Sequence, residues 1–216
     1  MAEAPVRNKQ EIVERIREAF RETQHPGDAF VQGSHEGCEP AEVSAPFKGL
    51  RHWSEVDSAI LDLNYTALSF FSDGAFRHFL PAFLIADLNG QLQTADPLFH
   101  LTHGFSSHVV KLPIGSRVHE KTVGTSAFVN PRRYGAMTWY DYACARLSVF
   151  TREEAAVILI YLEYKRDVDP HGATHGDINA ALDGFWRRRA QNAPTQAMLE
   201  SYLKAEADYM TDLNRK

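Results

Sequence analysis

The segment Leu68–Leu88 (LSFFSDGAFRHFLPAFLIADL) is the most apolar part of the chain. Ser72 is a good helix N-cap residue, and Asp73 suits the first turn of a helix because of the helix dipole. From Ala75 onward, apolar residues occupy nearly the whole circumference of a helix, which indicates burial on most sides. Pro81 removes one backbone donor and predicts a kink. The chain is therefore expected to fold around a central buried helix at this position.

Arg77 and His78 are the polar residues within this apolar segment. They are candidate binding residues, because a polar pair beside a helix kink is suited to the floor of a cleft. The alternative is structural: both side chains lie along a solvent-facing edge of the helix, or Arg77 holds a neighbouring loop. The structural interpretation is favoured, since charged side chains are usually solvated or paired.

A second buried helix is predicted after Thr151. Thr151–Glu154 has the sequence of a capping box, and the strongly apolar run Ala155–Tyr164 follows it. We expect this helix to pack on the central one. The fold class is therefore mainly α, a single helical domain with two buried central helices, an irregular middle region and a C-terminal helical extension. The domain is expected over residues 9–166 and the extension over residues 167–216.

The other elements are predicted from local signals. Asn8 is suited to cap a helix over about 9–23. Residues 28–46 and 91–134 are rich in glycine and proline and are expected to be irregular. Further helices are expected at about 54–62, 136–147 and 174–189 and after Pro194. The residues predicted to form the core lie on the two most apolar helices and are Phe76, Phe79, Phe83, Ile158 and Leu162.

The central segment also resembles a known sequence pattern. Phe70–Leu88 is similar to a motif of an uncharacterised bacterial domain family, in which an aromatic-Leu-Pro sequence lies inside a helix. Two shorter pieces are similar as well, Phe47–Trp53 upstream and the helix after Thr151 downstream. The resemblance covers about residues 9–166. The family has no assigned activity, so the resemblance implies a fold type without a chemistry.

Composition and charge narrow the class of protein. The chain has 216 residues, 24% of them charged, and a formal net charge of −5. This acidic balance argues against nucleic acid as the main partner. No segment is long and apolar enough for a membrane span, and the charged N-terminus does not resemble a signal peptide. Cys38 and Cys144 lie far apart in sequence, which predicts free thiols in a reducing cytoplasm.

Clustered histidines are the candidate metal ligands. His100, His103 and His108 form the densest group, and imidazole is a common ligand of transition metals. Gly104 and two serines separate His103 from His108, so these rings do not fit one helical face, and scattered loop histidines are the favoured alternative. The loop at 35–42 offers carboxylates and a thiol, but no second pair of ligands accompanies them. An acidic surface loop is therefore the favoured interpretation. We find no nucleotide-binding loop and no serine-hydrolase elbow, and no cofactor is expected.

Two functions from different classes follow. The favoured one is a small cytoplasmic binding protein, regulatory or partner-neutralising, because the sequence has no catalytic motif. Trp139 and Tyr140 are its further candidate binding residues, since aromatic side chains are enriched in interface cores. The partner is expected to be another protein, and the amphipathic last helix favours a homodimer. The alternative is a metal-dependent or acid–base enzyme that uses the clustered histidines and a carboxylate of the 36–42 loop.

Overall fold

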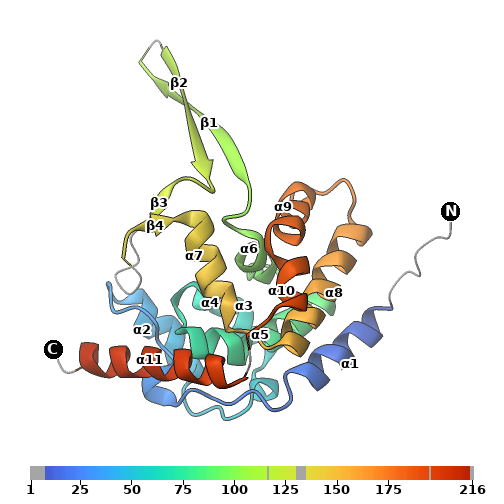
Figure 1. Cartoon of the computed structure of the whole chain (residues 1–216), viewed down its shortest axis with the longest axis vertical. Helices are drawn as coiled ribbons and strands as arrows, with labels where there is room; N and C mark the ends of the chain where they lie inside the picture. The colour runs from blue at the N-terminus through green and yellow to red at the C-terminus, as the bar shows by residue number, and fades with distance from the viewer. Residues whose placement is uncertain (1–7, 116, 130–134, 195, 215–216) are drawn as a thin grey trace.

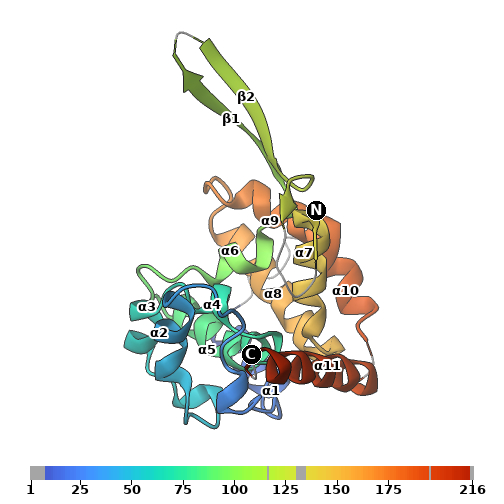
Figure 2. The same ribbon diagram turned by 90° about the vertical axis from the view of Figure 1, so that its left-hand side faces the viewer.

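The computed structural model describes residues 8–115, 117–129, 135–194 and 196–214. These residues form a helical body from which a long two-stranded hairpin projects (Figure 1). The last helix, α11 (Gln196–Asn214), lies at the end of the body opposite the hairpin, and Figure 2 shows the same arrangement from the side. The fold is predominantly α-helical, as the sequence predicts.

The elements follow one another in a simple order. The helices before α11 are α1 (Lys9–Ala19), α2 (Glu39–Ser44), α3 (Ser58–Leu63), α4 (Ala67–Phe70), α5 (Asp73–Leu88), α6 (Pro97–Thr102), α7 (Trp139–Arg146), α8 (Arg152–Val168), α9 (His175–Ala181) and α10 (Arg187–Gln191). A π-helical turn at Leu182–Trp186 joins α9 to α10, and short 3-10 turns lie at Asp28–Phe30, Ala45–Phe47, Trp53–Glu55 and Leu147–Val149. The strands are β1 (Ser107–Ile114), β2 (Arg117–Gly124), β3 (Phe128–Val129) and β4 (Met137–Thr138). β1 pairs antiparallel with β2, and β3 with β4.

α5 is the central helix. Ser72 caps it by accepting a hydrogen bond from the N–H of Ala75 at 3.0 Å, and the helix continues through Pro81. Nearly all of its side chains are buried, as its apolar circumference predicts. Phe47 packs against it, with its ring centroid 5.1 Å from that of Phe79. The core of the body is therefore assembled around this helix.

α8 is the second buried helix, and Thr151 and Glu154 form the predicted capping box at its start. Its closest neighbours are α1 and α10. Side chains join it to α5: Tyr161 Oη donates to Asp87 Oδ2 at 2.7 Å, and Lys165 Nζ lies 3.0 Å from the same atom. α8 therefore meets α5 through side chains, while the backbones of α1 and α10 flank it.

Several helix boundaries differ from the predicted ones. Asn8 caps α1 as expected, but α1 ends at Ala19 instead of about residue 23. The helix predicted over 54–62 begins only at Ser58, because the cap is Asp57, whose carboxylate accepts a hydrogen bond from the N–H of Ala59 at 2.8 Å. Residues 28–46, expected to be irregular, contain α2. Proline in its first turn is tolerated there, since the first N–H groups of a helix have no partner within it.

The prediction of an irregular region at 91–134 was wrong. Its described residues contain α6 and the hairpin β1–β2, while 116 and 130–134 lie outside the described residues. Pro113 indicated a break, but proline is tolerated in an edge strand when its missing N–H faces away from the ladder. The strands also lack a buried face, and their apolar alternation is confined to Val110, Leu112 and Ile114 of β1.

α11 packs on the body of its own chain. Met210 is buried, and the carboxylate of Glu206 accepts hydrogen bonds from the N–H groups of Asp73 (2.6 Å) and Gly74 (3.0 Å). These N–H groups begin α5, where the helix dipole favours a negative charge. Tyr202 Oη donates to the Asp73 carboxylate at 2.5 Å. One face of α11 is thus used within the chain, and the homodimer through this helix stays a prediction.

The two cysteines are free thiols, as predicted. Cys38 is exposed and Cys144 is half-buried. Burial raises the pKa of the Cys144 thiol, which keeps it protonated and unreactive near neutral pH.

The residues predicted to form the core are all buried, namely Phe76, Phe79, Phe83, Ile158 and Leu162. Replacing Phe83 by Ala is expected to lower the free energy of unfolding by about 3–5 kcal/mol, because apolar contacts are lost and a cavity is left. Chemical denaturation measures this change. The matched control is Phe128→Ala, since Phe128 is 79% exposed, and it should change stability by less than about 0.5 kcal/mol. Equal unfolding midpoints for Phe83→Ala and the unchanged protein would contradict the position of the core.

Candidate functional site

Arg77 does not lie on a solvent-facing edge of α5, so that form of the structural interpretation was wrong, but its charge is paired as expected. Its guanidinium is buried and donates to the carboxylate of Glu154 on α8 over distances of 2.9–3.1 Å. The same carboxylate accepts hydrogen bonds from Thr23 Oγ1 at 2.9 Å and from the N–H of Thr151 at 2.8 Å. A buried pair this well bonded holds elements together. Arg77 therefore joins α5 to α8.

His78 is fully buried, which also differs from the favoured interpretation. Its Nδ1 lies 2.9 Å from the carbonyl oxygen of Thr23 and donates to it. The rings of His25 and Phe79 meet it edge-on at 5.1 Å and 4.7 Å. Burial lowers the pKa of His78 to about 4, because a charged ring would lose its solvation. The ring is neutral near pH 7 and belongs to the core.

His100, His103 and Trp139 line one pocket of about 280 Å³ between α4, α5, α6 and α7. Its other lining residues are Leu68, Ser69, Phe76, Phe99, Tyr142, Ala143 and Arg146. The ring centroid of His103 lies 4.5 Å from that of Phe99 and 4.7 Å from that of Trp139. The fold thus brings together two candidate metal ligands, His100 and His103, and one candidate binding residue, Trp139. These residues lie on segments that are distant in sequence.

The charged group of this pocket is Arg146, which is buried and bonded. Its Nη1 donates to Asp73 Oδ1 at 2.6 Å, and its Nη2 donates to the carbonyl of Leu68 at 2.9 Å. Burial, and next the positive charge of Arg146, lower the pKa of His100 to about 3. Burial also lowers the pKa of His103. The pocket therefore presents aromatic rings and neutral imidazoles.

Tyr140 and His108 do not line this pocket. Tyr140 Oη donates to the carbonyl of Gly184 at 3.3 Å, beside the α9–α10 segment. At the start of β1, His108 Nε2 lies 3.1 Å from Ser106 Oγ and 3.4 Å from Asp177 Oδ1. Ser106 Oγ itself donates to Asp177 at 2.5 Å. Because one ring nitrogen faces both groups, this cluster is not a Ser–His–Asp relay, in which each partner uses a different nitrogen.

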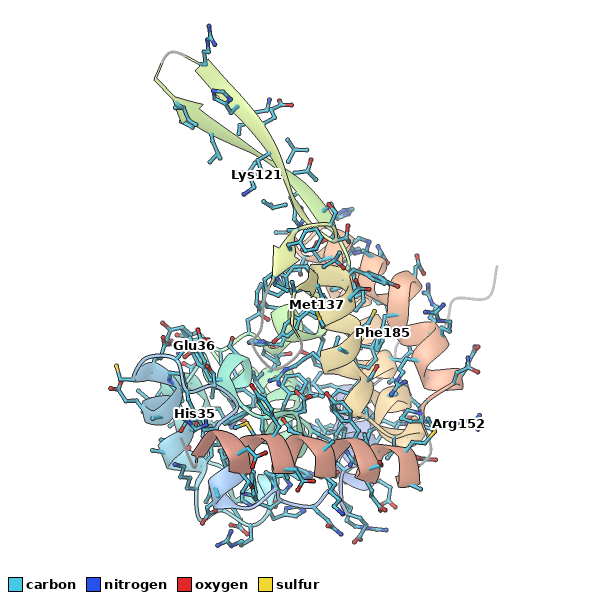
Figure 3. All side chains as sticks on the ribbon, turned by 60° about the vertical axis from the view of Figure 1, so that its left-hand side comes forward. His35, Glu36, Lys121, Met137, Arg152 and Phe185 are labelled. Carbon is cyan, nitrogen blue, oxygen red and sulfur yellow. The ribbon has the colours of Figure 1, made fainter. Side chains whose placement is uncertain are left out.

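The described residues contain no group of three or more His, Cys, Asp or Glu side chains that could hold a metal ion. Figure 3 places Glu36, from the loop expected to supply a carboxylate, at the outer edge of the body. Met137, near the base of the hairpin, lies well away from it. The described part of the chain therefore gives the metal hypothesis no converging set of ligands.

The hairpin Ser107–Gly124, here named the arm, is the feature that sequence reasoning missed. Every residue of β1 is exposed, and so are the residues of β2 up to Thr122. In Figure 3, which labels Lys121, the side chains of the arm project to both sides. Its exposed large apolar residues are Val109 (58%), Val110 (39%), Leu112 (41%), Ile114 (61%) and Val118 (64%). The sequence signal was the alternation of Val110, Leu112 and Ile114 with Lys111 and Pro113, followed by Gly115 as a turn residue.

The arm is basic although the chain is acidic. It carries Lys111, Arg117 and Lys121 against Glu120, a net charge of +2 with histidines neutral. Since the whole chain carries −5, the rest of it carries −7. The register sets an apolar row of β1 opposite a basic row of β2 on one face, with the pairs Val110–Lys121, Leu112–His119 and Ile114–Arg117. This face is suited to bind a ligand that is both apolar and acidic.

The base of the arm is fixed to α7. The N–H of Trp139 donates to the carbonyl of Ala127 at 2.8 Å, and the N–H of Tyr140 donates to that of Thr125 at 3.2 Å. Gly104, with φ of 96°, lets the chain pass close to α7, because a Cβ there would lie 2.9 Å from the carbonyl oxygen of Trp139. The arm is therefore mounted directly on the helical body.

A double-mutant cycle tests the buried ion pair. Arg77→Met is expected to lower the free energy of unfolding by about 3–5 kcal/mol, because it leaves the Glu154 carboxylate buried without its cation. Adding Glu154→Gln should restore part of this loss, since the buried charge is then removed. The control is Arg15→Met, which breaks an exposed pair with Glu11 and should cost less than about 1 kcal/mol. Strictly additive effects of the two core substitutions would contradict the coupling.

Buried His78 is expected to make the protein less stable in acid. Its pKa is lower in the folded chain than the ordinary value of 6.5, so the neutral ring favours folding. The stabilisation is fully present above pH 6.5 and is lost as the pH falls towards 4, by about 3 kcal/mol in full. His78→Asn keeps a donor near Nδ1 but cannot become charged. The free energy of unfolding of this variant, measured by denaturation across the same range, should fall less; an identical fall would refute the assignment.

The comparisons with known proteins find a family without an assigned function. The sequence model of DUF6714, described as a family of unknown function, matches residues 8–110. The match includes Phe47–Trp53 and Phe70–Leu88 but not the helix after Thr151, and the predicted domain boundary at residue 166 stays a prediction. No curated protein and no solved structure matches the chain. Among the described residues, no helix combines the length and apolar character needed to cross a membrane. Residues 8–110 are therefore similar to DUF6714, in agreement with the expected resemblance to an uncharacterised domain family.

Proposed function

We propose that this protein is a protein-binding module and that the arm is its binding element. The proposal is carried by the exposure of large apolar side chains along two strands of eight residues each. A two-stranded hairpin by itself is marginally stable in water. Covering its exposed apolar side chains with a partner is favourable, because apolar surface is removed from water. Contiguous exposed apolar surface of this kind is typical of interaction sites.

The chemistry of the arm favours a protein as the partner. Protein interfaces combine apolar side chains with arginine, and the arm sets Leu112 and Ile114 beside Arg117. The acidic charge of the rest of the chain opposes association with nucleic acid. Free thiols fit a reducing compartment, which supports a proposed location in the cytoplasm.

The pocket beside α7 extends the proposed surface. Trp139 begins the helix on which the arm is mounted and also lines the pocket. Phe99, at 48% exposure, contributes an aromatic wall that solvent reaches. An apolar side chain of the same partner can occupy this pocket while the arm binds the rest, so Trp139 is retained as a binding residue.

Site-specific photo-crosslinking tests the proposed function. A photoreactive phenylalanine analogue at Ile114 or at Val118 samples the two faces of the arm near its tip. In cells that make the protein naturally, both positions are expected to give a discrete adduct with a partner protein, which mass spectrometry identifies. The control position is Leu63 on α3, which is 81% exposed and should give no such adduct. Adducts of equal abundance at Leu63 and on the arm would contradict the proposal.

A second measurement separates binding from folding. With the crosslinker at Ile114, substitution of Val110 and Leu112 by Thr is expected to remove the adduct, because the apolar row is lost. Both side chains are exposed, so the free energy of unfolding should change by less than about 0.5 kcal/mol for each. A variant that keeps the adduct would show that the apolar row is not part of the interface.

A further inference from the structure

The register of the arm fixes which of its backbone groups face outward. Ile114 pairs with Arg117 across the two-residue connection, and Gly115, with φ of 62°, suits the primed turns that such hairpins use. The closing pair of a two-residue turn exchanges both of its hydrogen bonds, and bonded and non-bonded pairs then alternate along an antiparallel ladder. Pro113, which has no N–H, accordingly lies opposite Val118 at a non-bonded position. The outward-facing pairs are Pro113–Val118, Lys111–Glu120 and Val109–Thr122.

The two free edges of the arm therefore differ. On β1, Pro113 presents no N–H to a further strand, and an edge proline is a common obstacle to strand addition. On β2, Val118, Glu120 and Thr122 each present both an N–H and a carbonyl. The outer edge of β2 is thus the one on which a third strand can form a regular ladder.

The side chains along β2 determine which side chains a third strand needs in order to bind there. On one face, alternate positions of β2 hold Arg117, His119 and Lys121, all exposed. A strand added beside β2 sets its own side chains directly opposite these positions, where opposite charges stabilise the pair. Aspartate or glutamate at every second position of the added strand therefore complements this row.

We infer that the outer edge of β2 binds an extended acidic segment of the partner protein as a third strand. This inference rests on the proposed function, since it specifies how the arm holds its partner. Main-chain hydrogen bonds provide affinity, and the basic row provides specificity for acidic side chains. Other peptides that add to a sheet edge bind in the same way. The apolar row of β1 lies next to the basic row and remains free to contact the body of that partner.

A second copy of the chain fits this edge less well. If two β2 strands pair around a two-fold axis centred on Glu120, the two Glu120 side chains face each other and His119 faces Lys121. If the axis is centred on His119, Arg117 faces Lys121. Like charges directly opposite one another destabilise a sheet. A different, acidic chain avoids this repulsion.

Synthetic peptides and two proline substitutions test the inference. The probe is a fluorescent peptide in which glutamate alternates with threonine, and the comparison peptide has lysine in place of glutamate. Glu120→Pro removes an outward N–H from β2, whereas the matched control Lys111→Pro removes one from β1. Both variants lose the same exposed Lys111–Glu120 contact of 3.5 Å, so this contact cannot explain a difference between them. Circular dichroism and thermal melts establish that both variants are folded.

The acidic peptide is expected to bind the full chain and the lysine peptide not to bind. Glu120→Pro should weaken binding about tenfold or more in fluorescence anisotropy, while Lys111→Pro should leave it unchanged. The double variant Arg117→Glu with Lys121→Glu should lose the acidic peptide and gain the lysine peptide, because the charge pattern is reversed.

Three results would overturn the inference. They are equal effects of the two proline substitutions, binding of a DNA duplex that the charge-reversal variant loses, and a homodimer in light scattering that Glu120→Pro dissociates. If crosslinks on the arm capture a partner while the two proline variants behave alike, the proposed function stands and only the strand addition fails. If no crosslink forms on the arm, both fail.

Discussion

The helical body depends on the contacts that the buried carboxylate of Glu154 makes with three segments of the chain. This carboxylate is joined to Arg77 of α5, to the side chain of Thr23 beyond α1 and to the backbone of Thr151 at the start of α8. A carboxylate removed from water is unfavourable unless its lone pairs are satisfied and its charge is balanced, and here both conditions are met. One residue thus completes a local capping box and also fixes three segments that are distant in sequence. His78, next to Arg77, uses the same turn, because its ring bonds to the carbonyl of Thr23.

A second buried carboxylate, that of Asp73, joins the central helix to α7, which begins at the base of the arm. It bonds Arg146 of α7 and Tyr202 of α11, while Glu206 of α11 accepts hydrogen bonds from the first N–H groups of α5. The N-terminus of the central helix is therefore a junction of α5, α7 and α11. Since α7 begins at the base of the arm, the arm is mounted on a part of the body that charged, buried contacts hold in place. A rigid mount reduces the entropy lost when a partner binds.

The proposed interaction site has the opposite character. The candidate residues Arg77 and His78 are used in the core, and His100 and His103 pack as neutral rings in an aromatic pocket. The arm instead exposes apolar side chains, a basic row and an open strand edge. The buried carboxylates of Glu154 and Asp73 are paired and hydrogen-bonded within the body, whereas the side chains of the arm are exposed. This contrast is why we propose the arm as the binding element.

The sequence by itself determined the helices whose signals are local. The caps at Asn8, Ser72 and Thr151 and the apolar runs of α5 and α8 were predicted correctly, because caps and helical periodicity involve residues within a few positions of one another. The partner of Arg77 could not be predicted, since Glu154 comes close only when α5 and α8 are packed. The arm was missed because Pro113 and the glycines of residues 91–134 indicated loops, although Val110, Leu112 and Ile114 alternate with Lys111 and Pro113 in β1. Only the tertiary structure decided that the polar pair Arg77 and His78 is internal, and that part of the glycine- and proline-rich segment expected to be irregular forms an exposed hairpin.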